Sequence, residues 1–409
     1  MTTILHFPDF LREQKNTHMT HIEDKVLYGG VNGTRDAINA LRSLRDMLAG
    51  VDKGNVSVKW DGAPAIFAGT DPRDGKFFVS KKGIFNKNPK VYKTDADIDD
   101  DASGDLATKL KLSLKHFANI GIKGVIQGDL LFTKSDLKSQ KVAGLDYLTF
   151  HPNTIVYAIE KGSKDAEEIR KAEIGVVWHT TYSGDDFESM KANYGVNVKA
   201  LKKTPKVWQQ DAMLRDLSNT ATMSSKETDR VNAHLSRAGK LFTEISGSTL
   251  RTLEQNQKLA QLIEQFNNTF VRSNTVISDT DQHVRNLINW IENKYQKEID
   301  KRKSEKGKQT QRDALSKTLE FFSKENKRSL KKMFDLQKAI VSAKLILINK
   351  MNSIKRVKTF LQTTNGFRST EPEGYVAIDK LGDNAVKLVN RYEFSTNNFD
   401  PTILKGWSK

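Results

Sequence analysis

The sequence predicts an α+β protein in which two β-rich segments flank a long helical block. Short runs of β-branched and aromatic residues, bounded by glycine, proline and aspartate, fill much of residues 50–182 and return at 371–391. Between about 205 and 360, proline disappears and apolar residues recur at helical spacing. We therefore expect a β-rich domain whose first part is 1–204 and last part 363–409, interrupted by a basic helical insertion at 205–362.

A lysine ends the first predicted strand. Residues 56–59 alternate apolar and polar side chains, and Asp61-Gly62 is typical of a turn. Lysine is a poor nucleophile at its ordinary pKa of about 10.4, and an apolar pocket lowers that pKa enough to expose the lone pair. Asp61 could orient the Lys59 amine or share its proton, and Gly62 would let the backbone approach a phosphate. An isolated Lys-x-Asp-Gly is more often a surface lysine beside a hairpin turn.

The segment before this strand predicts a helix at 35–48, capped by Thr34 or Asn32. The preceding Gly29-Gly30 pair lacks the Gly-Lys-Ser/Thr of a phosphate-binding P-loop, so an ordinary helix start is favoured.

Several charged residues between 81 and 132 are candidates for the same site. Lys81-Lys82 ends another predicted strand and either approaches the same ligand as Lys59 or forms a solvated hairpin tip. Six aspartates within 95–105 favour an exposed loop over a metal site. After a predicted helix at 106–119, Asp129 lies in the middle of the apolar strand 124–132. Such a carboxylate needs a cation, hydroxyl or metal, so Asp129 is either a site residue or part of a structural ion pair.

Two strands with aromatic residues follow, at 148–159 and 174–182, and aromatic residues on strands most often belong to a core. His151 and His179 lie 28 residues apart without other ligand-type neighbours, so a metal role is not expected for them.

The charge balance favours a polyanionic partner. Lys and Arg exceed Asp and Glu by 16, and residues 301–358 alone hold 18 Lys/Arg against five Asp/Glu. A charge run is more often a solvated helix face, yet a surplus this large favours nucleic acid. The chain has no cysteine, no apolar run of 18 residues and no signal-like start, so we expect a soluble, cytoplasmic monomer without disulfides or a membrane partner.

Taken in order, these pieces resemble the motifs of the covalent nucleotidyltransferase superfamily of polynucleotide ligases and messenger-RNA capping enzymes. The similar segments are Lys59-Trp-Asp61-Gly62 (motif I), Gly128-Asp129-Leu-Leu-Phe132 (motif III), 155–159 (motif IIIa), Glu373-Gly374-Tyr-Val-Ala-Ile378 (motif IV) and Ala385-Val386-Lys387-Leu388 (motif V). The family usually has Glu where this chain has Asp129. The resemblance covers roughly 50–182 and 370–392 and implies an antiparallel-sheet adenylation domain that carries a large all-α insertion.

The resemblance also implies site roles. Lys59 would form a phosphoramidate with the AMP of ATP, Tyr157 would stack on the purine, with Trp178 as second choice, and Lys387 would contact the α-phosphate. The remaining implied assignments are Asp61 in catalysis, Gly62 and Lys82 in ATP binding, and Glu373 and Asp129 as ligands of Mg²⁺ or Mn²⁺. The usual second lysine of motif V is missing at Val389, and Arg391 or Lys380 could replace it.

Two differences from the motifs of DNA ligases and capping enzymes indicate the branch of the superfamily. Position 64 is proline where DNA ligases usually have arginine, and the 18 residues after Arg391 are too few for the OB domain of DNA ligases and capping enzymes. The RNA-ligase branch, frequent in bacteriophages, therefore fits best, with the helical insertion as a nucleic-acid clamp. The alternatives are a DNA or RNA/DNA hybrid ligase, and a non-enzymatic nucleic-acid-binding protein on a degenerate nucleotidyltransferase core.

Overall fold

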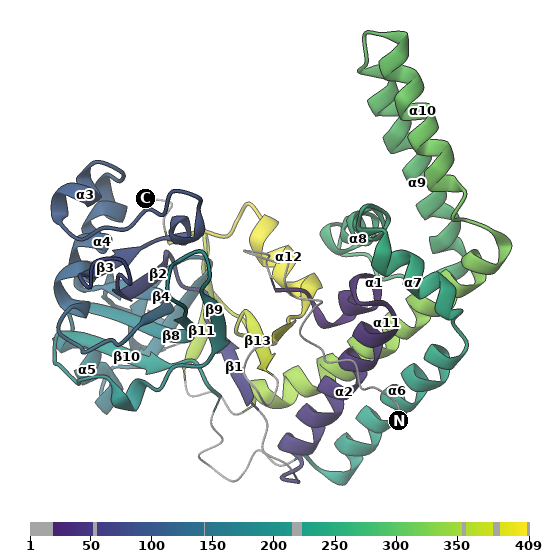
Figure 1. Ribbon diagram of the computed structural model, residues 1–409. Coiled ribbons are helices and arrows are strands. Elements are labelled where there is room, and N and C mark those ends of the chain that lie inside the picture. Colours follow the sequence, from purple (N-terminus) through teal and green to yellow (C-terminus); the bar gives the residue numbers. More distant parts are fainter. Residues whose placement is uncertain are drawn as a thin grey trace, which may run out of the picture.

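The structure is a computed structural model that describes residues 19–51, 55–142, 144–214, 223–353, 357–378 and 385–406. These residues form a β-rich part built from two sheets and a helical body from which a helical hairpin projects (Figure 1). A third, three-stranded sheet lies between the two parts. The predicted α+β class, with antiparallel sheets and a helical region, is confirmed.

The first sheet of the β-rich part has the strand order β10-β8-β4-β2-β3, with β9 paired to β8. Its strands are β2 (Ala65–Thr70), β3 (Phe77–Ser80), β4 (Val125–Thr133), β8 (Ile174–Ser183), β9 (Lys191–Tyr194) and β10 (Val207–Asp211). All pairs are antiparallel except β10 with β8. Helix α4 (Gly104–Phe117) packs on this sheet, because its apolar stripe buries Leu110 and Phe117 with Ile126 and Trp178.

The second sheet has the order β12-β11-β7-β6-β5, and the third has the order β1-β13-β14. Helix α5 (Lys164–Lys171) follows β7, and helix α12 (Arg391–Phe399) follows β14. The strands of these two sheets are β5 (Lys138–Val142), β6 (Leu145–Phe150), β7 (Ile155–Glu160), β11 (Lys358–Thr363), β12 (Gly366–Ser369), β1 (Asn55–Lys59), β13 (Gly374–Ile378) and β14 (Ala385–Leu388).

The helical body gathers two stretches of the chain. Helix α2 (Gly30–Leu48) buries Ile38, Leu41 and Leu44 in the same core as the later helices and the three-stranded sheet. Those helices are α6 (Ser225–Thr243), α7 (Gly247–Gln255), α8 (Gln257–Arg272), α9 (Thr280–Asp300), α10 (Glu305–Leu319) and α11 (Lys324–Asn352). Helices α9 and α10 form the projecting hairpin, and α10 has no fully buried residue (Figure 1).

The parts divide differently from the predicted segments. Strands β10 and β11 lie inside the predicted insertion 205–362, but they pair with β8 and β7 in the β-rich part. Helix α2 was placed with the β-rich domain and packs instead on α6, α7 and α11. Both differences have one cause. A short strand or an amphipathic helix joins the part of the fold that buries it, and the surface that does so is distant in the sequence.

Two local predictions also change. Helix α2 begins at Gly30, so Thr34 lies inside the helix and its hydroxyl donates to the carbonyl oxygen of Gly30. In the aspartate-rich segment, α3 (Asp95–Asp99) replaces the predicted loop because Thr94 and Asp97 form a capping box. Within the described residues, no helix combines the length and the apolar character that a membrane crossing requires.

Candidate functional site

Lys59 lies at the junction of the β-rich part and the helical body. It is the last residue of β1 and pairs in register with Gly374, which brings the preceding Glu373 beside it. The Lys59 ammonium forms an ion pair with the Glu373 carboxylate, and the two side chains are 25% and 9% exposed. Gly374 has φ +153°, and a Cβ there would lie 2.6 Å from the carbonyl oxygen of Leu388, so only glycine allows this approach.

Asp129 reaches the same place from β4. A Cβ on Gly62 would lie 2.5 Å from the Cβ of Asp129, so the glycine that ends motif I lets the turn lie directly against the Asp129 side chain. The Nε2 atom of His179 lies 3.7 Å from Oδ2 of Asp129. His179 is the extra residue of a β-bulge in β8, because Thr180 and Trp178 pair with the consecutive residues Gln127 and Gly128. Bulges re-aim side chains near functional sites.

Two more lysines, Lys387 and Lys82, place positive charge near Lys59, Asp129 and Glu373. Lys387 is half-buried on β14, opposite Val376. Lys82 is exposed in the short 3-10 helix η2 (Lys82–Phe85), and its charge acts on Asp129 and Lys387. Five predicted site residues thus gather here, and we call them, together with His179, the site cluster: Lys59, Lys82, Asp129, His179, Glu373 and Lys387.

Burial dominates the electrostatics of the site cluster. It raises the pKa of Asp129 and of Glu373 to about 7 each, although the charge of Lys59 opposes both shifts. Burial, reinforced by Lys59, lowers the pKa of His179 to about 4, so this imidazole is neutral at pH 7. Burial and the neighbouring Lys59 also lower the pKa of Lys387. Asp129 and Glu373 can therefore lose a proton and bind another cation near pH 7.

Asp61 does not have the predicted role. Strand β1 ends at Lys59, and the Asp61 carboxylate turns away to the loop before β7. Its Oδ1 accepts from the side-chain amide of Asn153 at 2.7 Å, and its Oδ2 accepts from the backbone N–H groups of Thr154 at 2.7 Å and Ile155 at 2.8 Å. With both oxygens occupied, Asp61 is an anchor between the first and second sheets and not the partner of the amine.

The two aromatic residues proposed for the purine are also corrected. Tyr157 is buried, its hydroxyl accepts from the backbone N–H of Asp61 at 2.7 Å, and its ring lies against Trp60 and Phe150. Trp178 is 0% exposed, and its indole N–H donates to Gln209 at 3.3 Å. Neither ring offers an open face, because aromatic residues in the middle of these strands fill the core.

Arg391 does not replace the missing lysine of motif V. Its guanidinium bonds Asp24 at 2.9 Å and also the side chain of Asn268, both in the helical body. Lys380 lies outside the described residues. His179, for which no site role is predicted from the sequence, joins the site cluster through a bulge between distant strands, and no local sequence signal marks such a position.

The available carboxylates fit a magnesium ion that is coordinated partly by the protein and partly by phosphate oxygens. Among the described residues, no group of three or more His, Cys, Asp or Glu side chains could hold a metal by itself. Magnesium usually takes one or two protein carboxylates together with substrate oxygens and water, and Asp129 and Glu373 match that habit. An open, shallow pocket adjoins Glu373 on the α12 side, and Phe394 lies in its lining.

Comparisons with known proteins bear on the family and not on the chemistry. No curated protein and no solved structure matches this chain. A family model described as a family of unknown function (DUF6267) matches residues 16–402, which is nearly the whole chain. The protein therefore belongs to the DUF6267 family.

Proposed function

We propose that this protein is an ATP-dependent polynucleotide ligase of the RNA-ligase type, with a nucleotidyltransferase fold in its β-rich part. The observation that carries the proposal is the Lys59–Glu373 ion pair, around which the site cluster collects. Four members of the site cluster, Lys59, Asp129, Glu373 and Lys387, come from segments far apart in the sequence, and those segments resemble motifs I, III, IV and V in order.

The first step joins AMP to the protein. The Lys59 amine, after losing a proton, attacks the α-phosphorus of ATP, so an N–P bond forms, the bond between the α-phosphorus and its bridging oxygen breaks, and pyrophosphate leaves. Glu373 is placed to take the proton, because it already holds the ammonium and burial raises its pKa to about 7.

The second and third steps seal a strand. A terminal 5′-phosphate oxygen attacks the α-phosphorus, which breaks the N–P bond, frees Lys59 and leaves AMP on the polynucleotide end. A 3′-hydroxyl oxygen then attacks the 5′-phosphorus, AMP departs, and the hydroxyl proton is lost to a base. Lys387 and Lys82 supply fixed positive charge where phosphoryl oxygens gain negative charge. A bound Mg²⁺, held by Asp129 and Glu373, would neutralise further phosphoryl charge.

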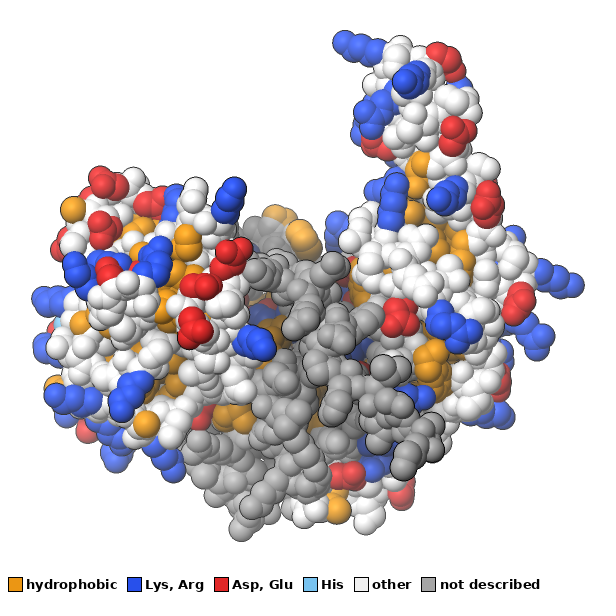
Figure 2. Space-filling view, in the orientation of Figure 1, with side chains coloured by type: hydrophobic (Ala, Val, Ile, Leu, Met, Phe, Trp, Pro, Cys, Tyr) orange, Lys and Arg blue, Asp and Glu red, His pale blue; other side chains and the backbone are white. Residues whose placement is uncertain are grey.

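The basic charge of the helical hairpin favours a nucleic-acid partner. We call its outer part, residues 294–312, the basic arm: it carries eight Lys/Arg and three Asp/Glu. Figure 2 shows Lys and Arg side chains spread along the projecting hairpin, with acidic side chains between them. Surface lysines that neutralise phosphates release counterions, so this arm is suited to a phosphate backbone of any sequence.

Self-labelling tests the enzyme proposal. The full chain is incubated with Mg²⁺ and ATP labelled at the α-phosphate, and we expect acid-labile label on Lys59. Lys59→Ala abolishes the label, whereas Lys141→Ala, at an exposed strand position outside the site cluster, retains it. An unlabelled wild-type chain, or label that persists in Lys59→Ala, refutes the proposal. Labelling by GTP instead would assign the chain to capping chemistry.

Joining assays across RNA, DNA and mixed ends define the substrate. We expect RNA ends to be joined fastest, and preference for DNA or hybrid ends would correct the substrate class. The basic arm is tested by replacing Lys301, Arg302, Lys303 and Lys306 with alanine, against a control with Lys138, Lys141, Lys161 and Lys164 replaced. Only the arm variant should flatten the dependence of log affinity on log salt, by about 0.7 to 0.9 for each phosphate that the variant no longer neutralises. Arm-dependent binding without self-labelling would favour the non-enzymatic alternative.

A further inference from the structure

A lysine-rich loop covers the face of the first sheet that carries Asp129. We call residues 81–93, between β3 and α3, the lysine loop. Its residue Phe85 packs on Phe67 and Tyr182, and the Tyr182 hydroxyl donates to Gln127 at 2.7 Å. Gln127 precedes Asp129 by two positions on β4, so both side chains point to the same face of the sheet. The loop therefore lies beside the site cluster.

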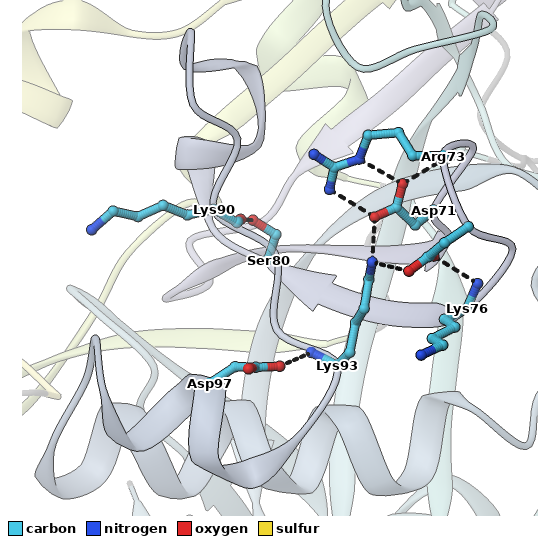
Figure 3. A network of polar contacts seen from close by, with 8 residues as sticks. Asp71, Arg73, Lys76, Ser80, Lys90, Lys93 and Asp97 are labelled. Carbon is cyan, nitrogen blue, oxygen red and sulfur yellow. Dashed lines mark hydrogen bonds and ion pairs between the residues drawn. The ribbon is translucent and has the colours of Figure 1, made fainter.

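Polar contacts hold the far end of the lysine loop (Figure 3). The backbone of Tyr92 exchanges two hydrogen bonds with Val79, at 2.9 and 3.0 Å, and the Ser80 hydroxyl donates to the carbonyl oxygen of Lys90. The Lys93 ammonium lies 2.7 Å from a carboxylate oxygen of Asp71 and 2.7 Å from one of Asp74. The loop is consequently fixed to the edge of the sheet.

Asp101, from the aspartate-rich segment, ties the two flanks of η2 together. Its Oδ2 lies 3.2 Å from the Lys81 ammonium and accepts from the Tyr92 hydroxyl at 2.6 Å, and its Oδ1 pairs with the Lys90 ammonium. Hydrogen bonds from Lys90 and Tyr92 hold the pKa of Asp101 well below its usual range. This carboxylate thus stays ionised and occupied by the loop's own cations.

The ion pairs of the lysine loop leave Lys82 and Lys87 over. In the described part of the chain, no ion pair joins either lysine to a carboxylate, and of the two it is Lys82 whose charge acts on Asp129 and Lys387. The chain lacks a second lysine in motif V, and Arg391 is bound within the helical body. A polyphosphate that reaches from Lys387 toward the lysine loop would therefore meet Lys82 first.

We propose that the lysine loop is a preformed polyphosphate subsite, in which Lys82 binds the phosphates beyond the α-phosphate of ATP and Asp101 is a positioning residue that holds Lys82 in place. This inference rests on the proposed function for the identity of the ligand, but its test does not need catalysis. Preformed cations bind phosphate better than mobile ones because less conformational entropy is lost on binding.

The probe is inorganic tripolyphosphate, titrated calorimetrically into the full chain. We expect Lys82→Ala and Asp101→Asn each to weaken binding about three- to tenfold, since one charge-assisted hydrogen bond to the probe is removed or misplaced. The double variant should bind no more weakly than Lys82→Ala, because Asp101 acts through Lys82. Asp99→Asn is the matched control: it lies in the same aspartate-rich segment but pairs with Lys111 at 2.7 Å, and it should bind like the wild type.

Two readouts separate positioning from damage to the fold. AMP has no phosphate beyond the α position, so its affinity should not change in Asp101→Asn, whereas a general structural defect would weaken it too. Asp101→Glu should restore most of the tripolyphosphate affinity. The inference is overturned if the wild type does not bind tripolyphosphate, if Asp101→Asn binds it normally, or if the effects of the two substitutions multiply. Lys82-dependent binding without self-labelling would leave the subsite standing and reject the ligase.

Discussion

Two lysine–glutamate pairs, one in the site cluster and one in the helical body, show opposite electrostatics. Lys344 of α11 donates to both carboxylate oxygens of Glu23 at 2.9 Å, and the two side chains are 1% and 6% exposed. Burial alone would raise the pKa of Glu23, but Lys344 and Arg391 together lower it. Burial instead raises the pKa of Glu373 to about 7 in spite of Lys59.

The difference lies in how completely each carboxylate is satisfied. Glu23 has Lys344 on both oxygens and the Arg391 guanidinium at 3.6 Å, and these two cations keep it ionised. Arg391 lies closer to the neighbouring Asp24, whose pKa burial raises to about 7. Glu373 has one lysine that is 25% exposed and two further acids, Asp61 and Asp129, that raise its pKa. A carboxylate paired on both oxygens stabilises one conformation, whereas a carboxylate with a single, partly exposed partner retains the capacity to bind or react.

The largest expected effect is a difference in the free energy of unfolding between substitutions of Lys344 and of Lys59. Lys344→Met should lower the free energy of unfolding by about 3 to 5 kcal/mol, because Glu23 would remain buried without its partner. Lys59→Met should lower it by less than about 1 kcal/mol, because Glu373 can take up a proton near neutral pH. Urea unfolding at pH 7 measures both. Equal losses would contradict the distinction between the clusters.

The self-labelling rate should depend on Glu373 and not on Glu23. Glu373→Gln should slow self-labelling by at least about a hundredfold, since the amide can neither accept the Lys59 proton nor replace a carboxylate ligand. Glu23→Gln should retain the labelling rate per folded molecule while unfolding at lower urea concentration. Single-turnover labelling on samples of known folded fraction makes the comparison, and a Glu23→Gln variant that is folded but inactive would show that the helical-body pair takes part in the chemistry.

A third carboxylate tests whether position near Lys59 suffices for a chemical role. Asp61→Asn should cost about 1 to 3 kcal/mol of unfolding free energy, because an amide nitrogen would face one of the N–H donors that Asp61 now accepts from. Asp146→Asn, at an exposed position of β6, should be neutral. Loss of labelling in Asp61→Asn at unchanged stability would return Asp61 to the catalytic group.

The smallest expected effect is a dependence of metal affinity on pH. Asp129 and Glu373 have pKa values of about 7, so protons compete with Mg²⁺ below neutrality. At subsaturating Mg²⁺, labelling should rise several-fold from pH 6 to pH 8 and level off above that range. Saturating Mg²⁺ should weaken the rise without removing it, because Glu373 must still be ionised to accept the Lys59 proton. Because both pKa values are raised on folding, the metal-free protein should also lose stability as pH rises through 7. A rise that is unchanged in Glu373→Gln would assign it to another group.

Local pattern was sufficient to predict many elements of this chain. Alternation predicted the strand of Lys59, runs of apolar and β-branched residues predicted the strands of Asp129 and Lys387, and periodic apolar residues predicted helix α4 and the helical character of the segment from about 205 to 360. These features depend on neighbours a few positions apart, and the physical rules for strand alternation and helix periodicity act at that range.

Contacts between distant segments were decided by tertiary structure alone. Asp61 finds its donors some 92 to 94 positions away, and Lys344 finds Glu23 at a separation of 321. Asp101 became an anchor only because the lysine loop folds back over it, and His179 entered the site through a bulge. The sequence by itself determined which residue types and which strands were present. The packing of sheet against sheet and of helix against sheet determined which of those charges are satisfied and which remain able to react, because a pKa depends on burial and on partners that no local pattern contains.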